Sequence, residues 1–435
     1  MKATAKINTS VTHHLWPLKR LFPSNNLLDC WDVVLFALQS GKFLEAMYSI
    51  FLELRYRWCH VFRIRSRLIE FKPTPIWRCG SEHSLDLADL EATLRLHNFS
   101  VIESATTWFV ITERADGTIF GATHDRPRVL QQADNLSSIP TELFEFDKPI
   151  FCVFVSNSNR IFVATKGVVY LSKNGGSHFD PVLQLSHCDS TVWHNHGIDE
   201  APEGLLIGEY ASIIETARTW TFWKSVSYLY FTSDDGESWH RSDGLVRNGA
   251  KHVHLVKYSR RFARMLVTDG DKRKQSYLIS RIEQMKPRDF KEARFDSYIW
   301  GGGHTSFAET ANATLLGTDY RIAPNSIVRM RSSKDITAKM LPRPYRHSPV
   351  LNMFCMKGRA GTITFAYLQG GLCGRCQNAL IYSDDDGDRW YRLIEFDEYV
   401  NFFICNAQQG ANQSVVLSFS NKKSGENRSF IVSAI

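Results

Sequence analysis

The chain has 435 residues, of which 43% are hydrophobic and 22% are charged, a composition typical of a folded globular protein and not of a disordered one. The net charge of +7 is modest, and much of the basic excess lies near the N-terminus, so no nucleic-acid-binding surface is predicted. No uncharged run is long enough to span a bilayer, and no secretory signal pattern is present. With its nine cysteines interpreted as reduced thiols, the protein is expected to be cytoplasmic.

Residues 1–72 form a basic N-terminal segment that is expected to be helical. From Leu27 to Leu68 the apolar residues recur at helical spacing, and Gly41 separates two candidate helices, which predicts a helical hairpin. Its second half interleaves arginines with aromatic residues, a mixture that suits either an anionic membrane surface or packing against the rest of the protein. The first alternative places the protein at the inner face of a membrane, and the second is the simpler one.

From residue 100 onward, short β-rich runs separated by Gly, Asn and Asp replace the helical pattern, which is typical of an all-β domain. One run recurs at intervals of about 40 to 60 residues, the size of a propeller blade. The six copies are GTIFGAT from Gly117, NRIFVAT from Asn159, EGLLIGEY from Glu203, ARMLVTDG from Ala263, ATLLGTDY from Ala313 and GTITFAY from Gly361. We therefore predict that residues 73–435 form a β-propeller of about seven blades, with six blades as the alternative.

The last blade needs a strand from elsewhere in the chain. From residue 400 to the C-terminus the pattern supplies only three strands. We predict that residues 74–80, TPIWRCG, supply the fourth, because joining the two ends of the domain closes the ring and removes exposed strand edges.

A second motif follows the first in several copies: YLSKNGGSHF from Tyr170, YFTSDDGESW from Tyr230 and IYSDDDGDRW from Ile381. These runs resemble the Asp box, Ser-x-Asp-x-Gly-x-x-Trp, of the repeats in sialidase-like propellers. The pattern suits a tight hairpin in which a carboxylate or amide binds turn N–H groups and glycine takes a left-handed conformation. Gly236 and Gly387 are therefore expected to have positive φ angles. The polar members are expected to be structural: Asn174, Asp235, Asp385 and Asp386.

Histidines recur where the innermost strands are predicted to start. These starts read WHNHG from Trp193, KHVHL from Lys251, GGGHT from Gly301 and RHSPV from Arg346. Because each innermost strand begins, and each second strand ends, at the same face of a propeller, both line the mouth of the channel. The histidines expected there are His194, His196, His252, His254, His304 and His347. The second strands are expected to add Glu209, Tyr210, Asp269, Asp319 and Tyr320.

Neutral imidazoles beside carboxylates can bind a divalent metal such as Zn or Mn, or move protons. The predicted metal ligands are His196, His254, His304 and Asp269. The predicted catalytic residues are His194, His196, Glu209, Tyr210, Asp319 and Tyr320. Trp193 and Arg321 are expected to contact the substrate. The alternative is that each histidine forms hydrogen bonds inside its own blade.

Two further resemblances concern chemistry. The run from Tyr320 to Pro324 resembles the Arg-Ile-Pro motif of sialidase-like enzymes, which implies that Arg321 holds a substrate carboxylate. The run EAPEGLLIGEY resembles the repeats of streptogramin-lyase-like propellers. Some propeller polysaccharide lyases likewise combine histidines, a tyrosine and a metal.

Two functions are therefore predicted. The first is an enzyme, a polysaccharide lyase or glycoside hydrolase, that acts on an anionic or hydroxyl-rich glycan with the help of a metal. The second is a non-catalytic propeller that binds a glycan or protein partner through the same face, for example in polysaccharide biosynthesis. In that second function the N-terminal segment is expected to dock the protein to a membrane or to an assembly of proteins.

Overall fold

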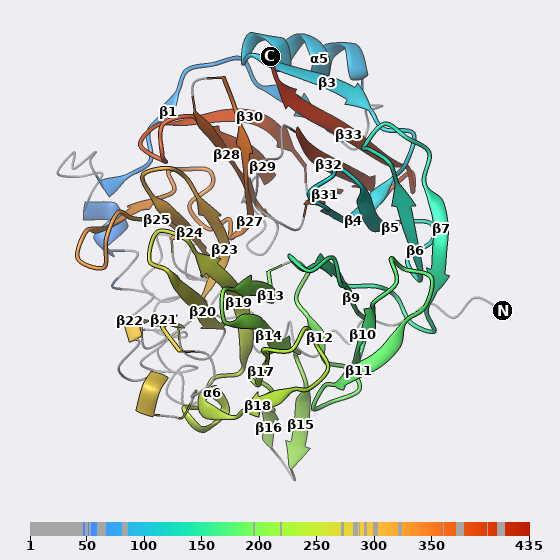
Figure 1. Ribbon diagram of the computed structural model, residues 1–435. Coiled ribbons are helices and arrows are strands. Elements are labelled where there is room, and N and C mark those ends of the chain that lie inside the picture. The colour runs from blue at the N-terminus through green and yellow to red at the C-terminus, as the bar shows by residue number, and fades with distance from the viewer. Residues whose placement is uncertain are drawn as a thin grey trace.

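The computed structural model shows an all-β propeller of seven blades arranged around a central axis (Figure 1). The first blade consists of β4 (Trp108–Glu113), β5 (Ile119–Thr123), β6 (Val129–Ala133) and β7 (Thr141–Glu145). The second consists of β8 (Cys152–Val155), β9 (Ile161–Ala164), β10 (Val168–Ser172) and β11 (Asp180–Gln184). The third consists of β12 (Thr191–Val192), β13 (Ile198–Ala201), β14 (Gly204–Tyr210), β17 (Leu229–Thr232) and β18 (His240–Ser242).

The remaining blades follow the same antiparallel order from the axis outward. The fourth consists of β19 (His252–Ser259), β20 (Arg264–Gly270), β21 (Lys274–Ile279) and β22 (Arg294–Tyr298). The fifth consists of β23 (His304–Glu309), β24 (Thr314–Thr318), β25 (Ser326–Met330) and β26 (Ile336–Met340). The sixth consists of β27 (Val350–Lys357), β28 (Thr362–Leu368), β29 (Asn378–Ser383) and β30 (Trp390–Phe396). The seventh contains β31 (Val400–Ile404), β32 (Ser414–Asn421) and β33 (Asn427–Ala434).

The structure describes most of the propeller and a few residues of the N-terminal segment. The described residues are 47, 51, 54–58, 67–80, 86–194, 196–217, 220–270, 274–281, 286, 288–290, 294–298, 303–320, 324–359, 361–370, 378–397, 399–406 and 414–435. Apolar residues of neighbouring blades pack together, as Phe120 of the first blade and Val153 of the second do in one cluster. The core therefore consists of hydrophobic layers between blades, and each blade depends on its neighbours for burial.

An N-terminal strand closes the ring, but it is not the predicted one. The outermost strand of the seventh blade is β3 (Phe99–Glu103), which pairs antiparallel with β33 along its whole length. The prediction that residues 74–80 close the ring was wrong, because β2 (Trp77–Cys79) pairs in parallel with β30 of the sixth blade. β1 (Phe71–Lys72) joins the same outer edge.

Helix α5 (Leu87–Leu96) explains why β2 joins the sixth blade and β3 closes the seventh. It begins at the N-cap Asp86, whose carboxylate accepts hydrogen bonds from the N–H groups of Ala88 and Asp89. Its apolar side buries Leu90 and Leu94 in the hydrophobic cluster shared by the sixth and seventh blades. The helix therefore carries the chain from the edge of one blade to the edge of the next, which covers both edges.

The hairpins that resemble Asp boxes share one set of hydrogen bonds. In the sixth blade, the Ser383 hydroxyl donates to Asp385 Oδ1 (3.0 Å) and accepts a bond from the Gly387 N–H (3.0 Å). The same bonds recur in the second blade, with Ser172, Asn174 and Gly176, and in the third, with Thr232, Asp234 and Gly236. This repeated geometry makes the hairpins structural turns.

The glycine prediction is confirmed, and one polar assignment is corrected. The φ angles of Gly236 and Gly387 are 91° and 79°. In the third blade, however, Asp234 and not Asp235 binds the turn amides, since Ser238 N donates to Asp234 Oδ1 (2.9 Å). Asp235 instead has a positive φ of 56° at the tip of the turn.

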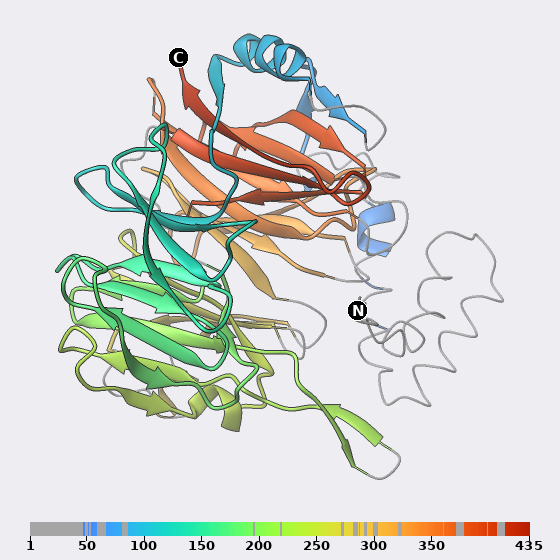
Figure 2. The same ribbon diagram turned by 90° about the vertical axis from the view of Figure 1, so that its right-hand side faces the viewer.

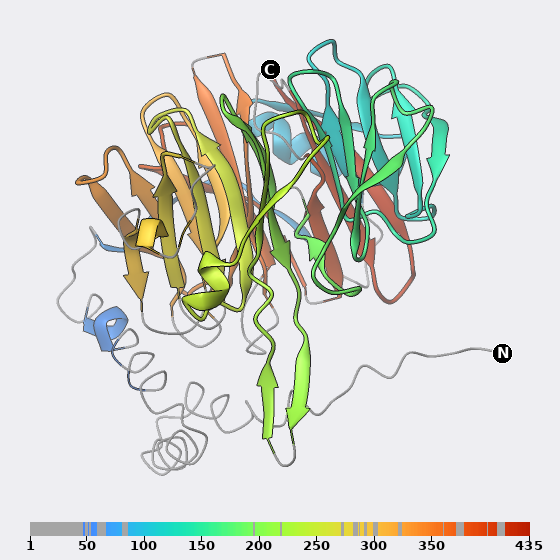
Figure 3. The same ribbon diagram turned by 60° about the horizontal axis from the view of Figure 1, so that its bottom comes forward.

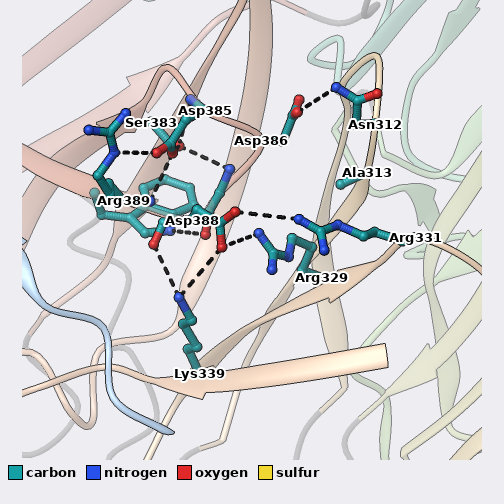
Figure 4. A network of polar contacts seen from close by, with 12 residues as sticks. Asn312, Ala313, Arg329, Arg331, Lys339, Ser383, Asp385, Asp386, Asp388 and Arg389 are labelled. Atoms are coloured by element: carbon teal, nitrogen blue, oxygen red, sulfur yellow. Dashed lines mark hydrogen bonds and ion pairs between the residues drawn. The ribbon is translucent and has the colours of Figure 1, made fainter. Parts of the chain in front are cut away.

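The same hairpins join neighbouring blades (Figure 4). A Cβ atom added at Gly387 would lie 2.9 Å from a methyl carbon of Leu315 in the fifth blade, which is too close. Asp388 in this hairpin forms ion pairs with three basic residues of the fifth blade: Arg329, Arg331 and Lys339. The sixth-blade turn is therefore a contact between blades as well as a chain reversal.

Most of the predicted N-terminal hairpin, from Leu27 to Leu68, lies outside the described residues. Among the described ones, Met47, Phe51 and Leu54–Trp58 are helical. Tyr56 is fully buried, and the guanidinium of Arg346 lies 5.3 Å from the centre of its ring. This part of the segment therefore packs against the propeller. In the described part of the chain, no helix is both long and apolar enough to cross a membrane.

Candidate functional site

A small cavity lies where the innermost strands of four blades converge. It has a volume of about 120 Å³, and its lining includes Phe109 of β4, Asn352 of β27, Asn401 of β31 and the turn before β13. The turn contributes Trp193, His194 and His196. Since innermost strands of separate blades meet only around the propeller axis, this cavity lies at the mouth of the central channel. We call it the channel pocket.

The turn from Trp193 to Gly197 holds the two histidines at the pocket. The N–H groups of His196 and Gly197 donate to the Trp193 carbonyl oxygen, at 3.0 and 3.2 Å. His194 has a positive φ of 41°, a left-handed conformation that costs a non-glycine residue about 1 to 2 kcal/mol. The surrounding structure therefore maintains a strained turn at the position where both imidazoles line the cavity.

Trp193 is held by a column of rings. Its indole stacks on Tyr210, with ring centroids 5.0 Å apart. Tyr210 in turn lies 4.2 Å from the imidazole of His252, centre to centre. The predicted residue Tyr210 therefore supports the pocket wall from behind and is not part of the lining.

Both histidines of the pocket are uncharged at neutral pH. Burial lowers the pKa of His194 to about 4. Burial also holds the pKa of His196 well below its usual range, and the nearby positive charge of Lys257 acts in the same direction. The Asn352 side chain beside His196 acts on this pKa in the opposite direction. The imidazoles can therefore accept or donate hydrogen bonds without carrying charge.

The rest of the lining is also neutral. Asn352 donates from its amide nitrogen to the Ile404 carbonyl (3.0 Å), so its Oδ1 atom is the acceptor that it offers to His196 or to a ligand. Gln369 and Asn401 add two further amides, and Phe109 and Phe403 contribute aromatic rings whose centroids are 5.9 Å apart. Among the lining residues that the structure describes, none is an Asp, Glu, Lys or Arg.

The histidines of the fourth and fifth blades lie outside this lining. His252 Nε2 and His254 Nε2 are 2.9 Å apart, and His252 Nδ1 lies 2.7 Å from the Ala211 carbonyl oxygen. Only an N–H can bond that carbonyl, so His252 carries its proton on Nδ1 and the shared bond is donated by His254. His304 Nδ1 bonds the Ser276 hydroxyl (2.8 Å). His252 and His254 therefore bond each other within the fourth blade, whereas the bonds from His252 to Ala211 and from His304 to Ser276 join neighbouring blades. The simpler alternative, in which each histidine bonds inside its own blade, holds only for the His252–His254 pair.

The predicted carboxylates of Glu209 and Asp269 also form hydrogen bonds with residues of the blades. Glu209 is fully buried and accepts hydrogen bonds from the Ser186 hydroxyl (2.6 Å) and the Tyr230 hydroxyl (2.7 Å). Asp269 accepts a bond from the Gln275 N–H (2.6 Å). Neither residue lines the channel pocket.

The fifth-blade candidates are likewise separate from the pocket. Tyr320 is buried, and its N–H donates to the Asn325 side chain (2.6 Å). The N–H of Asp319 donates to the Gly303 carbonyl (2.9 Å). His347 is buried beside Arg346, and Arg321 lies outside the described residues.

The predicted metal ligands do not bring three ligand atoms to one point, although the rings of His196 and His254 both lie beside Trp193, with centroids 6.0 and 5.0 Å from that of the indole. Within the described ranges, only His187, Cys188 and Asp189 place three ligand atoms within 4.8 Å of one another, and they lie in a loop where two of the three are exposed. His196, His254, His304 and Asp269 therefore do not surround a common point, because a metal ion needs three or more ligands about 2 Å from its centre. Repeat register placed these residues correctly along their strands but did not determine the directions of their side chains.

Sequence reasoning missed the residues from the first, sixth and seventh blades. Phe109, Asn352 and Asn401 stand at the starts of innermost strands, which is the register position that was used to select the histidines. The same rule, applied to every residue type and not only to histidine, would have selected them.

The sequence matches no family model and no curated protein. Among solved structures, streptogramin B lyase is 13% identical, with 78% of this chain and 99% of that chain covered and a TM-score of 0.46. YCF48 bound to D1 peptide is 9% identical, with 78% and 95% covered and a TM-score of 0.46. The Pan2 WD40 domain of Neurospora crassa is 10% identical, with 76% and 90% covered and a TM-score of 0.43. Likenesses this distant carry no functional argument, and the propeller is assigned from the seven blades of this chain.

Proposed function

We propose that the protein binds one unit of a neutral, hydroxyl-rich glycan in the channel pocket. The observation that carries this proposal is the lining itself. Its described residues combine two uncharged imidazoles, three amide side chains and several aromatic rings, and none of them is charged. The sequence predicted either an anionic or a hydroxyl-rich glycan. The uncharged lining favours the hydroxyl-rich one.

The lining suits sugar hydroxyls for a physical reason. Each hydroxyl is both donor and acceptor, and amides and neutral imidazoles offer both functions at fixed positions. Aromatic rings such as Trp193 and Phe403 provide apolar surfaces for the C–H faces of a sugar ring. A volume of about 120 Å³ suits the end of a ligand and not a long segment of a chain.

Binding is favoured over hydrolysis. Glycoside hydrolases generally place two carboxyl groups beside the scissile bond, and the described residues that line the channel pocket include none. A low pKa, as at His194, also makes an imidazole a weak proton acceptor. The proposal is therefore the binding alternative, with glycan cleavage as the outcome that would replace it.

Saturation-transfer NMR with a panel of neutral monosaccharides and oligosaccharides tests the proposal. We expect at least one neutral sugar to bind, and Asn352→Ala and His196→Ala to weaken that binding about tenfold. His178→Ala is the matched control, because that histidine lies on an exposed hairpin of the second blade. Thermal melting of each variant checks the fold.

Three results would contradict the proposal. They are binding restricted to uronic acids, loss of binding in the His178→Ala control as well, and the appearance of cleaved product. Cleavage that depends on His196 would favour the lyase alternative.

A further inference from the structure

A second cavity lies outside the channel, beside the fourth blade. It has a volume of about 330 Å³ and lies between the strands β21 and β22 and the end of α6 (Gly244–Arg247), which Figure 1 shows near one another. Its lining consists of Arg247, Asn248, Gly249, Gln275, Tyr277, Phe290 and Arg294. We call this cavity the arginine pocket.

The described lining of the arginine pocket contains two arginines and no acidic residue. Arg247 and Arg294 are both exposed. Arg247 donates from Nε to Asp243 (2.8 Å), which leaves its terminal nitrogens for a ligand. Arg294 has no ion pair with any described carboxylate. Two guanidinium groups at one cavity favour an anion with several oxygen atoms, which each group can bind through two parallel hydrogen bonds.

A third donor comes from Gln275. The hydroxyl of Tyr277 donates to Gln275 Oε1, so the acceptor of the amide is engaged inside the protein. The remaining polar group of the side chain is its NH₂, which is a donor. The Gln275 N–H bonds Asp269, and this bond fixes the position of the residue on β21. The pocket therefore presents donors from α6, β21 and β22.

The floor of the cavity is aromatic. Tyr277 and Phe290 are each 1% exposed, and their rings meet edge to face with centroids 5.3 Å apart. A free inorganic anion would leave much of a 330 Å³ cavity unfilled. We propose that the arginine pocket binds a small organic phosphate or sulfate monoester whose body is about the size of one sugar ring.

Calorimetry with glucose 6-phosphate, glucose 6-sulfate, inorganic phosphate and glucose tests this proposal. We expect at least one of the two esters to bind, inorganic phosphate to bind more weakly and glucose not to bind. Arg294→Gln and Arg247→Gln should each weaken ester binding about tenfold, because each removes one guanidinium group with its charge and its paired N–H donors. Arg264→Gln is the matched control, since Arg264 is an exposed arginine at the other end of the same blade's strands.

The proposal is overturned if neither ester binds, or if Arg294→Gln and Arg264→Gln bind the esters as tightly as each other. Binding of glucose that depends on Arg294 would also overturn it. The channel-pocket variant Asn352→Ala should leave ester binding unchanged, so this result is independent of the proposed function.

An independent observation concerns the helical residues before the propeller. Met47, Phe51, Leu54 and Trp58 are separated by four, three and four positions, which places them on one face of a helix. Their exposed fractions are 44%, 57%, 56% and 62%. We call this face the apolar stripe. Tyr56, on another side of the helix, is fully buried against the propeller.

Basic residues accompany the stripe. Between Met47 and Lys72 the sequence contains five arginines and one lysine against two glutamates. Of the described arginines, Arg57 and Arg67 are exposed. An exposed apolar and aromatic face with flanking arginines complements an anionic membrane surface, whose headgroups attract the charges while the apolar side chains enter the interface.

The orientation of the propeller on such a surface follows from its topology. The hairpin of β15 (Ile214–Ala217) and β16 (Trp220–Trp223) leaves the third blade just after Tyr210, whose ring stacks on Trp193 of the channel pocket. Figures 2 and 3 show this hairpin and the short N-terminal helix on the same side of the ring. We infer that the apolar stripe attaches the protein to an anionic membrane with the channel mouth facing the lipid.

Vesicle flotation tests this second proposal. We expect the full chain to float with vesicles of phosphatidylcholine and phosphatidylserine, and not with phosphatidylcholine alone. The double variant Phe51→Ser and Trp58→Ser, and separately Arg57→Glu, should lose most of the bound fraction. Ile139→Ser, at an isoleucine that is 82% exposed on the first blade, and Arg264→Glu are the matched controls.

Equal flotation of the double variant and the Ile139→Ser control would overturn this proposal. So would the absence of vesicle binding together with stripe-dependent self-association, since the stripe would then be an interface between proteins. Neither result depends on whether the channel pocket binds a sugar.

Discussion

The indole of Trp193 and the phenol ring of Tyr210 are stacked, with their planes 17° apart. Trp193 lines the channel pocket, whereas Tyr210 lies behind it at the end of β14. Tyr210 is therefore a positioning residue, which acts on a ligand through the orientation of the indole.

Replacing Tyr210 by alanine should weaken sugar binding about tenfold, because the indole loses the surface that holds it. Tyr210→Phe keeps the ring and should restore affinity. Saturation-transfer NMR measures both. Equal loss in the two variants would show that the hydroxyl, and not the stacked ring, is what the pocket requires.

Replacing His194 by asparagine should separate stability from binding. Asparagine tolerates a positive φ better than histidine does, so the thermal stability at pH 7 should be unchanged or higher. Sugar binding should nevertheless weaken, because one imidazole of the lining is lost. Calorimetric melting and ligand titration on the same sample give both values. If His194→Asn lost stability and kept its affinity for the sugar, His194 would be neither strained nor part of the binding site.

Stability should depend on pH through His194. Its pKa is about 4 in the folded protein, against an ordinary value of 6.5, so between these pH values the unfolded chain binds more protons than the folded one. The free energy of unfolding should therefore decrease as the pH falls from about 6.5 to 4, and this group should have no effect above that range. His194→Asn should show a shallower dependence when denaturant unfolding is measured across this interval.

Gly387→Ala should be more destabilising than Gly117→Ala. Both glycines have a positive φ, 79° and 89°, so both substitutions bring the same backbone cost of about 1 to 2 kcal/mol. Only at Gly387 would the new methyl group also press on Leu315, because no atom lies within 4 Å of the corresponding position at Gly117. Chemical denaturation gives the free energy of unfolding of each variant. The difference between the two losses is the contribution of the contact with Leu315 in the neighbouring blade. Equal losses would mean that Leu315 moves aside without cost.

Removal of divalent metals should leave sugar binding unchanged. The described residues bring three ligand atoms together only in the exposed loop at His187, away from the channel pocket. Dialysis against EDTA, followed by the same NMR titration, checks this. Loss of binding that zinc or manganese restores would show that sugar binding requires a metal.

The repeats alone predicted the all-β class, the blade count and the positive φ angles of Gly236 and Gly387. These properties follow from local rules: strand periodicity, turn chemistry and the spacing of one blade. The box in the third blade was misassigned by one residue, because Thr232 can replace serine as the hydroxyl that binds the turn amides.

Properties that depend on contacts distant in the sequence were decided by the tertiary structure. Whether Trp77 or Phe99 began the closing strand depended on how α5 packs across two blades, which no local pattern records. Register placed the histidines at the right ends of their strands. The turn at His194, which is local, holds His194 and His196 at the pocket. His252 and His304 instead bond Ala211 and Ser276 of the preceding blades, and these bonds can form only when neighbouring blades pack together.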